Sequence, residues 1–381
     1  MTRKNLASFT LMFVFVGAMH AQQPGIILGS DTTFRVITTA VPFLMISPDA
    51  RSAALGDAGS ALSPDINSAF WNPAKVVFIE DSYGGGISWT PWLGKIVNDM
   101  WIAYLPGFYK ISREQAVAGS LKYFDLGDIS FRGSGNEPLG DFNPRELALD
   151  ITYSRMLTEA FSVGLTGRYI YSNLTGSLQS GAVDARPINS VAVDLGVFYT
   201  KELQSAKTSN LSLAAVISNI GPKVSYTDNA NRNFIPTNLR LGAAYTREVD
   251  PFNSFTFVAD LNKLMVPTIN RGQSVLSGMF SSFTDAPGGF SEEIKEFILN
   301  TGVEYWYNRT FAARIGYFLE AKEKGNRKYM TLGLGFRNQK SFGIDVAYLV
   351  PTNSRENPLA ETLRFSLLFQ IKKAAEESVT D

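Results

Sequence analysis

The sequence contains no cysteine and only one histidine, His20. Without cysteine the chain has no disulfide, no thiolate nucleophile and no thiolate metal ligand. The imidazole of His20 is lost as well if the leader described below is cleaved. A Ser–Lys or paired-carboxylate enzyme stays open, but no such pair stands at a recognisable spacing, so we expect no catalytic residue, no metal site and no cofactor. We expect packing and backbone pairing alone to stabilise the fold.

Charge and long apolar runs are also scarce. Charged residues make up 18% of the chain, and 35 basic side chains balance 35 acidic ones. A neutral chain of this kind has no basic surplus with which to bind nucleic acid. The sequence is instead rich in glycine (32), phenylalanine (27) and tyrosine (15). Aromatic enrichment without a run of about 20 apolar residues favours strands over membrane helices.

Residues 1–21 predict a secretory signal peptide. Arg3 and Lys4 form the positively charged start, Leu6 to Ala18 form the apolar core, and the small residues that follow predict cleavage before Gln22. The alternative, a membrane anchor, is disfavoured because the apolar run is too short to cross a bilayer of about 30 Å as a helix. We therefore expect an exported protein.

Residues 22–78 form an N-terminal segment whose later part, Pro42 to Phe78, is rich in small residues. Prolines at positions 48, 64 and 73 exclude one long helix or strand. Ala50–Leu62 predicts a short helix, and Asp65–Phe70 predicts one further turn. Because the rest of the chain is a series of similar strands, we predict that the segment plugs the space inside them.

The candidate residues of this plug are charged groups around its predicted helix and a turn near its end. The carboxylates at positions 49, 57 and 65 are spaced unlike a calcium loop, so we expect them to cap helices and support turns. Asn72-Pro73-Ala74 is expected to form the turn from plug to first strand, which is a structural role. The plug set is Asp49, Arg51, Asp57, Asn72, Pro73 and Ala74.

From Ser82 onwards, apolar residues alternate with small or polar ones, which is the period of a β-strand. Fourteen such segments of about 9–13 residues have the length that a tilted strand needs to cross a membrane. The expected spans are 82–92, 98–107, 115–125, 145–157, 161–173, 189–202, 209–219, 237–248, 252–263, 298–307, 309–320, 327–338, 341–350 and 361–372.

The connections between these segments alternate in length. Every second one is short, such as Leu157–Phe161 and Tyr307–Arg309, whereas the others include long ones, such as Asp125–Pro144 and Leu264–Phe297. Membrane barrels have short periplasmic turns and longer external loops, and a closed barrel satisfies every backbone polar group in lipid. We therefore predict an all-β fold, a fourteen-stranded antiparallel transmembrane barrel of residues 79–372, in preference to a soluble sandwich.

Charged residues within the strands fall on the face expected to point into the barrel. This predicts a salt-bridged, partly filled lumen and no ion path of one sign. The residues are Lys122, Glu146, Asp150, Arg168, Asp194, Arg240, Asp260, Arg314, Arg337, Asp345 and Arg364. The charged tail, residues 373–381, is expected to lie in the periplasm, as is the N-terminal end of the mature chain.

The connection Leu264–Phe297 is the most distinctive external loop. Ser291 is expected to cap a short helix with two glutamates in its first turn, and an apolar face of that helix includes Phe290 and Ile294. Such a face is either a docking surface for a partner or a flap folded over the barrel mouth. The candidate partner-binding residues are Asp285, Pro287, Gly288, Gly289, Phe290, Ile294 and Phe297.

The chain resembles the PorV family, outer-membrane proteins of the type IX secretion system of Bacteroidetes, from about Thr38 to Phe369. The likeness lies in the blocks PFLMISPDARSAALGDAG, FWNPAK, YTDNANRNFIPTNLRLGA, DLNKLMVP, DAPGGFSEEIKEF, GVEYWYNRTFAARIGYFLEAKEKGNRKY and NPLAETLRFSLLF. The chain has Ala53-Ala54 where the family pattern often has two glycines. The plug with Asn72-Pro73-Ala74 also looks like the hatch of FadL-type outer-membrane barrels.

The resemblance implies a non-enzymatic role in protein export. It implies that secreted proteins with type IX C-terminal domains are received at a SprA/Sov-type translocon and passed to a PorU-type sortase, the complex that attaches them to surface lipopolysaccharide. Outer-membrane lipid or lipopolysaccharide is a further expected partner. Two alternatives stay open: a FadL-like transporter of hydrophobic small molecules, and a scaffold that caps another barrel.

Overall fold

The structure is a computed structural model that describes residues 35–94, 99–132, 135–136, 138–174, 179–180, 183–184, 186–203, 208–227, 232–270, 272–338, 341–352 and 362–371. The chain divides into a first unit, Met1–Thr33, and a second, Phe34–Asp381, and only the second is described. The predicted signal peptide and C-terminal tail, and the predicted periplasmic position of both ends of the mature chain, fall outside the described residues.

Fourteen antiparallel strands close into a barrel, as predicted. Each strand pairs with the next one along the chain, and β1 closes the ring by pairing with β18 from Tyr83↔Ile371 to Trp89↔Phe365. The strands are β1 Tyr83–Pro91, β2 Trp101–Lys110, β3 Gln115–Asp125, β6 Arg145–Thr158, β7 Phe161–Asn173, β10 Ile188–Leu203, β11 Ser209–Ile220, β12 Asn238–Glu248, β13 Asn253–Leu264, β14 Phe297–Tyr307, β15 Phe311–Leu319, β16 Lys328–Arg337, β17 Phe342–Pro351 and β18 Leu363–Ile371.

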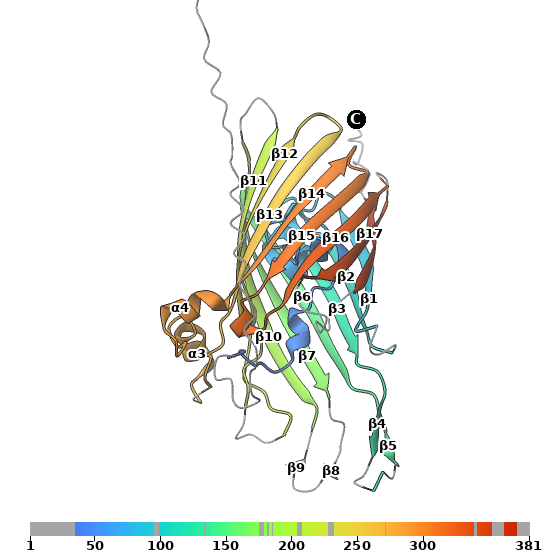
Figure 1. Ribbon diagram of the computed structural model, residues 1–381. Helices are drawn as coiled ribbons and strands as arrows, with labels where there is room; N and C mark the ends of the chain where they lie inside the picture. The colour runs from blue at the N-terminus through green and yellow to red at the C-terminus, as the bar shows by residue number, and fades with distance from the viewer. Residues whose placement is uncertain are drawn as a thin grey trace, which may run out of the picture. The chain divides into compact units, whose positions relative to one another are not determined.

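The two ends of the barrel differ in their connections, which confirms the predicted alternation. At the short-loop end, β6 and β7 are separated by only two residues, and β14 and β15 by only three. At the long-loop end the connections carry further elements (Figure 1). These are β4 Ile129–Arg132, β5 Pro138–Phe142, β8 Gln179–Ser180, β9 Val183–Asp184, α3 Val275–Ser281, α4 Phe290–Glu293, η3 Ile294–Glu296 and η4 Lys322–Lys324. None of the helices in the described residues is long and apolar enough to span a bilayer.

The strand faces follow the alternation read from the sequence. In β10, Val191 and Leu195 are exposed on the outside, whereas Ala192 and Asp194 are buried on the inside. Phe198 lies on the same inward face but is a large apolar residue among small and polar ones. It is fully buried, and its ring meets Phe78 edge-to-face at 5.5 Å between centroids. The predicted luminal charges are buried except Arg337, which is half-buried.

Four short helices build residues 40–79, which we call the luminal segment: η1 Pro42–Met45, α1 Ala50–Ala53, α2 Ser68–Trp71 and η2 Pro73–Phe78. The helix predicted over Ala50–Leu62 is wrong in length. It stops at Ala53 because Gly56 (φ 71°) and Asp57 (φ 62°) take left-handed backbone conformations that a helix cannot contain. The second helix begins at Ser68, inside the predicted turn Asp65–Phe70.

The luminal segment passes through the barrel from the long-loop end to the short-loop end. Near the long loops, Arg35 N donates to Glu323 O at 3.1 Å and Ala40 N donates to Phe234 O at 2.9 Å. Near the short loops, Lys110 Nζ donates to Ile79 O at 2.6 Å. Between these points the segment, blue in Figure 1, is surrounded by strands.

Candidate functional site

The inner wall makes room for the luminal segment with glycines. A Cβ built on any one of six inward glycines would collide with atoms of the segment, in three cases with its backbone and in the other three with its side chains. On β7 the obstacle is the backbone of Pro73 and Ala74, and on β15 it is the backbone of Leu55 and Gly56. The six are Gly164, Gly196, Gly242, Gly302, Gly316 and Gly333.

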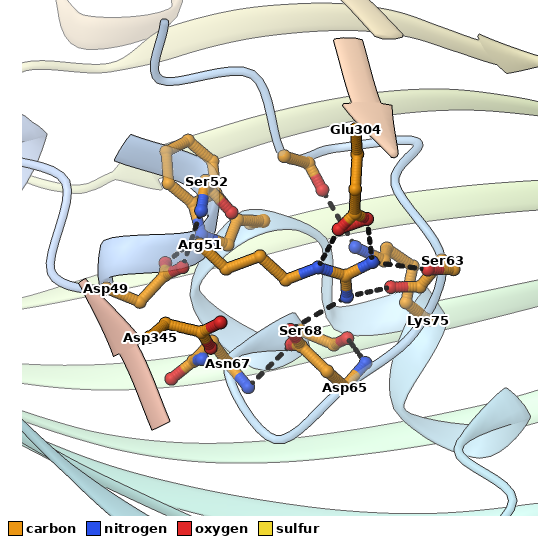
Figure 2. A network of polar contacts seen from close by, with 12 residues as sticks. Asp49, Arg51, Ser52, Ser63, Asp65, Asn67, Ser68, Lys75, Glu304 and Asp345 are labelled. Atoms are coloured by element: carbon orange, nitrogen blue, oxygen red, sulfur yellow. Dashed lines mark hydrogen bonds and ion pairs between the residues drawn. The ribbon is translucent and has the colours of Figure 1, made fainter. Parts of the chain in front are cut away.

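Arg51 of the luminal segment belongs to a chain of charges of alternating sign, in which it lies between Asp65 and Glu304 (Figure 2). Its guanidinium binds Glu304 of β14 through two hydrogen bonds, Nε to Oε1 at 2.9 Å and Nη2 to Oε2 at 2.8 Å, and binds Asp65 at 3.0 Å. Glu304 also accepts from Arg314 Nε at 3.1 Å, and Arg314 pairs with Asp345 at 2.7 Å. Charges of opposite sign therefore alternate from the segment into the wall.

Two strand residues that the plug set did not include hold the segment elsewhere. Asp260 of β13 accepts from the backbone N–H groups of Gly59 and Ser60, both at 2.9 Å, and from Ser60 Oγ at 2.7 Å. Lys122 of β3 donates to the carbonyls of Phe43, at 2.8 Å, and Ile46. The sequence marks both residues only as luminal charges, because most of their partners are backbone groups, which the sequence pattern does not reveal.

The predicted capping role of the plug aspartates holds for Asp49. Its carboxylate accepts from Ser52 N at 2.8 Å, which caps α1, and from Trp71 Nε1 at 2.6 Å, which ties α1 to α2. Asp57 instead accepts from Tyr329 Oη of β16 at 2.6 Å and lies 3.5 Å from Arg364 of β18. Asp57 therefore links the segment to the wall.

Asn72 lies between α2 and η2, and Pro73 and Ala74 are the first two residues of η2. The three residues therefore do not lead directly into β1, which begins at Tyr83. Asn72 Oδ1 accepts from Ala74 N at 3.0 Å, which caps η2, and Asn72 Nδ2 donates to Val197 O of β10 at 3.0 Å. The carbonyl of Ala74 accepts from Ser154 Oγ at 3.0 Å and from Ser162 Oγ at 2.6 Å. This turn is thus bonded to β6, β7 and β10.

Replacing Asn72 by alanine should lower the free energy of unfolding by about 2 kcal/mol, because a cap is lost and a buried carbonyl loses its donor. Urea unfolding in lipid vesicles measures the change. Asn67→Ala is the matched control: Asn67 is also buried in the segment, but neither Oδ1 nor Nδ2 has a hydrogen-bond partner, so its loss should cost little. Equal losses for the two variants would contradict the role of Asn72.

A small cavity of about 100 Å³ remains beside the segment, toward the long-loop end. Apolar and charged groups both line it, among them Trp71, Ile298, Phe318, Arg240 and Arg364. Arg240 lies over the Trp71 ring, with 4.7 Å from its guanidinium carbon to the ring centroid, and Arg240 Nε donates to Asn262 Oδ1 at 2.7 Å. A wider, open cavity of about 700 Å³ lies at the short-loop end, where Arg51, Asp65, Phe78 and Trp306 are among its lining residues. Residues of the luminal segment therefore line both cavities.

The loop between β13 and β14 presents an apolar surface. It contains two helices, α3 and α4, of which α3 has no counterpart among the predicted elements. The expected cap is wrong: α4 begins at Phe290, before Ser291, and follows Gly289, whose φ of 69° is left-handed. Phe297 is half-buried at the start of β14. Four large side chains stand exposed and form what we call the loop patch: Leu276 (63%), Phe280 (70%), Phe290 (79%) and Ile294 (54%).

The other predicted loop residues shape the backbone around the patch. Gly288 N donates to Glu292 Oε2 at 2.7 Å, and Gly289 N donates to Ala286 O at 2.9 Å. Asp285 Oδ2 accepts from Thr268 N at 3.1 Å, and Pro287 is exposed. Burial, together with the charges of neighbouring glutamates, raises the pKa of Asp285. These residues set the turn before α4.

Ion pairs of α4 and η3 fix this part of the loop to the end of β13 and to the neighbouring η4. Lys263, at the end of β13, binds Glu293 at 3.4 Å and Glu296 at 2.5 Å. Lys324 of η4 binds Glu296 at 2.8 Å and Glu292 at 2.7 Å. Arg35, just before the luminal segment, also binds Glu292, at 3.2 Å. Sequence reasoning missed this network, because its charges come from four stretches of chain that are well separated in the sequence.

The pKa values of these loop groups reflect the pairing. Burial alone would raise the pKa of Glu296, but the hydrogen bonds from Lys263 and Lys324 outweigh it and lower that pKa. The hydrogen bond from Lys324 likewise holds the pKa of Glu292 below its usual value. Burial opposes a charge on Lys324, yet its two glutamate partners raise its pKa. All three groups are therefore charged at neutral pH.

The structure thus places the two predicted sets in different parts of the molecule. The plug set lies inside the barrel against the strands, and the loop set lies in the connection from β13 to β14. Among the residues that the structure describes, no three His, Asp or Glu side chains gather to hold a metal ion.

Closed strand pairing, an apolar outer face and a filled interior define a transmembrane β-barrel. Among solved structures, the chain is similar to the toluene transporter TbuX of Ralstonia pickettii, with 12% identity over 85% of this chain and 98% of that chain and a TM-score of 0.48. It is similar also to the deltaS2S3 mutant of the monoaromatic hydrocarbon channel TodX, with 12% identity over 85% and 99% of the two chains and a TM-score of 0.51. At this identity the likeness shows the fold alone.

No curated protein matches the chain by sequence. Residues 29–271, more than half of the chain, match the family described as type IX secretion system protein PorV, and the chain belongs to this family. It is therefore an outer-membrane component of type IX secretion.

Proposed function

We propose that this protein is a non-enzymatic carrier in type IX secretion, which binds the C-terminal domains of secreted proteins with the loop patch. The observation that carries this proposal is that Leu276, Phe280, Phe290 and Ile294 are all exposed on one loop. Buried ion pairs hold the part of this loop around α4 and η3 in place. Solvent-exposed apolar clusters of this kind mark interaction surfaces. A fixed surface also loses little conformational entropy on binding.

The filled lumen supports carriage outside the barrel and not conduction through it. The luminal segment forms hydrogen bonds with β3, β6, β7, β10, β13, β14 and β16. We therefore propose that residues 40–79 act as a permanent plug. The alternative of a transporter for hydrophobic molecules ranks second. The cavity beside Trp71 is only about 100 Å³, and the wider cavity of about 700 Å³ at the short-loop end has charged groups, among them Asp65 and Arg337, in its lining.

Replacing Phe280 and Phe290 together by serine should reduce binding of a cargo C-terminal domain at least ten-fold, since central aromatic anchors each contribute about 2 kcal/mol or more to an interface. Co-purification from outer membranes measures the loss. The control is the double change Ile111→Ser and Phe252→Ser, which removes apolar side chains of similar exposure from the short-loop end. Undiminished binding by the loop variant, or by a chain with the whole loop shortened, would sink the proposal.

The carrier role and the cap role predict different ratios of this protein to the translocon when cargo is present and when it is absent. As a carrier, the protein should exchange between a translocon of the SprA/Sov type and an attachment complex of the PorU type, and its ratio to the translocon should fall when cargo is present. As a cap, it should keep a constant ratio to the translocon with or without cargo. Quantifying co-purified proteins in the two states distinguishes these roles.

A further inference from the structure

The outer wall of the barrel has a groove where β10 extends past β11. The last residue of β11, Ile220, pairs with Val193, so that Ile188 to Ala192 pair with β7 alone. The chain leaves β11 through Gly221 and Pro222 and crosses close to the exposed part of β10, where the carbonyl of Val191 faces Gly221. The groove has a volume of about 570 Å³ and lies at the long-loop end.

Positive charge lines the outer rim of this groove. Arg186, Lys223 and Arg232 contribute to it, and none of the described residues that line it is an aspartate or glutamate. Lys223 Nζ lies 4.1 Å from the centroid of the Phe234 ring and donates to Asn270 Oδ1 at 3.4 Å. Both of these partners are neutral.

The side of the groove that is formed by β7 and β10 is part of the lipid-facing wall of the barrel. Val191 and Tyr169, which pair across β10 and β7, are 60% and 42% exposed on the outer face. Tyr169 Oη donates to Asn189 Oδ1 at 2.6 Å, so the phenol points its polar end toward the loops. Aromatic residues with one apolar and one polar end favour the boundary between acyl chains and headgroups.

We propose that this groove binds the phosphate-bearing headgroup of a lipid in the outer leaflet, with the acyl chains along β7 and β10. Arginine suits the task because its planar guanidinium can donate two parallel hydrogen bonds to a phosphate. The combination of a cationic rim with an apolar wall selects a lipid over a soluble anion, since only a lipid occupies both. The site depends on membrane insertion and not on cargo binding, and it is separate from the loop patch.

The test is native mass spectrometry of the full-length barrel in detergent, with lipid A as the probe and enzymatically dephosphorylated lipid A as the comparison. Arg186→Gln, Lys223→Gln and Arg232→Gln are combined in one variant. The wild-type protein should retain phosphorylated lipid A in preference to the dephosphorylated form. Each lost cation should weaken retention about five-fold, the fold-change expected for a basic residue at an anionic membrane surface.

The control variant combines Arg155→Gln, Lys201→Gln and Arg247→Gln, which removes the same charge from exposed positions nearer the short-loop end of β6, β10 and β12. Loss of lipid A in the groove variant alone supports the site. Equal loss in both variants, or in neither, overturns it, and displacement by millimolar inorganic phosphate overturns the lipid in favour of a soluble phosphate. If the triple variant does not fold, Arg186→Gln alone gives the same comparison against Lys201→Gln.

Discussion

Replacing Glu304 by leucine should lower the free energy of unfolding by about 3–5 kcal/mol, the cost of leaving buried charges without a partner. Glu304 is fully buried and is bound by two arginines, Arg51 from the luminal segment and Arg314 from β15. Arg314 retains the fully buried Asp345 when Glu304 is removed. Arg51 retains one charged partner, Asp65, which is less buried than Asp345, and the neutral acceptors of Ser63. The greater part of the loss should therefore come from Arg51.

The double variant Arg51→Met with Glu304→Leu is the control for this prediction. It removes one positive and one negative charge, and the remaining Arg314, Asp345 and Arg337 stay in contact with one another. Replacing a whole buried ion pair by apolar residues is often nearly neutral. Urea unfolding in vesicles should therefore show the double variant to be markedly more stable than Glu304→Leu, and a double variant that is less stable than the single one would contradict the pairing.

The barrel was predictable from the sequence because its signal is local. The alternation of apolar and polar residues within a strand such as β10 can be read from neighbouring residues alone. Because every strand of the barrel has one face in lipid, every strand shows this alternation. Loop lengths then order the strands, because short turns join antiparallel neighbours. Phe198 shows where the alternation of polarity fails as a guide. Its position in β10 points it inward, and an apolar side chain is accommodated there because the luminal segment supplies Phe78 as an apolar neighbour.

The contacts of the luminal segment were not predictable, because they join residues far apart in the sequence. Arg51 and Glu304 are 253 positions apart, and no local pattern selects Glu304 from the other carboxylates. The helix predicted over Ala50–Leu62 failed for a related reason. Small residues permit a helix, but the turn at Gly56 and Asp57 is imposed by the wall, where Gly56 N donates to Thr331 Oγ1 at 2.9 Å.

The inward glycines belong both to the local strand pattern and to the long-range contacts of the luminal segment. In the sequence they are merely small residues within a strand pattern, yet in the structure they mark where the luminal segment touches the wall, at some positions through its backbone and at others through its side chains. Gly164 of β7 and Gly167 of the same strand look alike in the sequence. The first faces the segment, with Pro73 and Ala74 against it, whereas the second is exposed on the outside and has no atom within 4 Å of an added Cβ.

Replacing Gly164 by valine should therefore displace the luminal segment from its contact with β7. The new side chain would overlap backbone atoms of Pro73 and Ala74, which cannot rotate away as a side chain can, and overpacking of this kind costs about 1–3 kcal/mol or more. We expect a lower free energy of unfolding, faster proteolysis within residues 40–79, and ion conductance through a planar bilayer where the wild-type barrel is closed.

Gly167→Val is the matched control, with the same substitution in the same strand but on the outer face. Valine favours strands, so any change in backbone propensity is shared by the two variants. Gly167→Val should keep wild-type stability and stay closed to ions, because its side chain meets only lipid. If Gly164→Val were as stable and as closed as Gly167→Val, the segment would not be seated against the wall through its backbone, and its role as a permanent plug would fail with it.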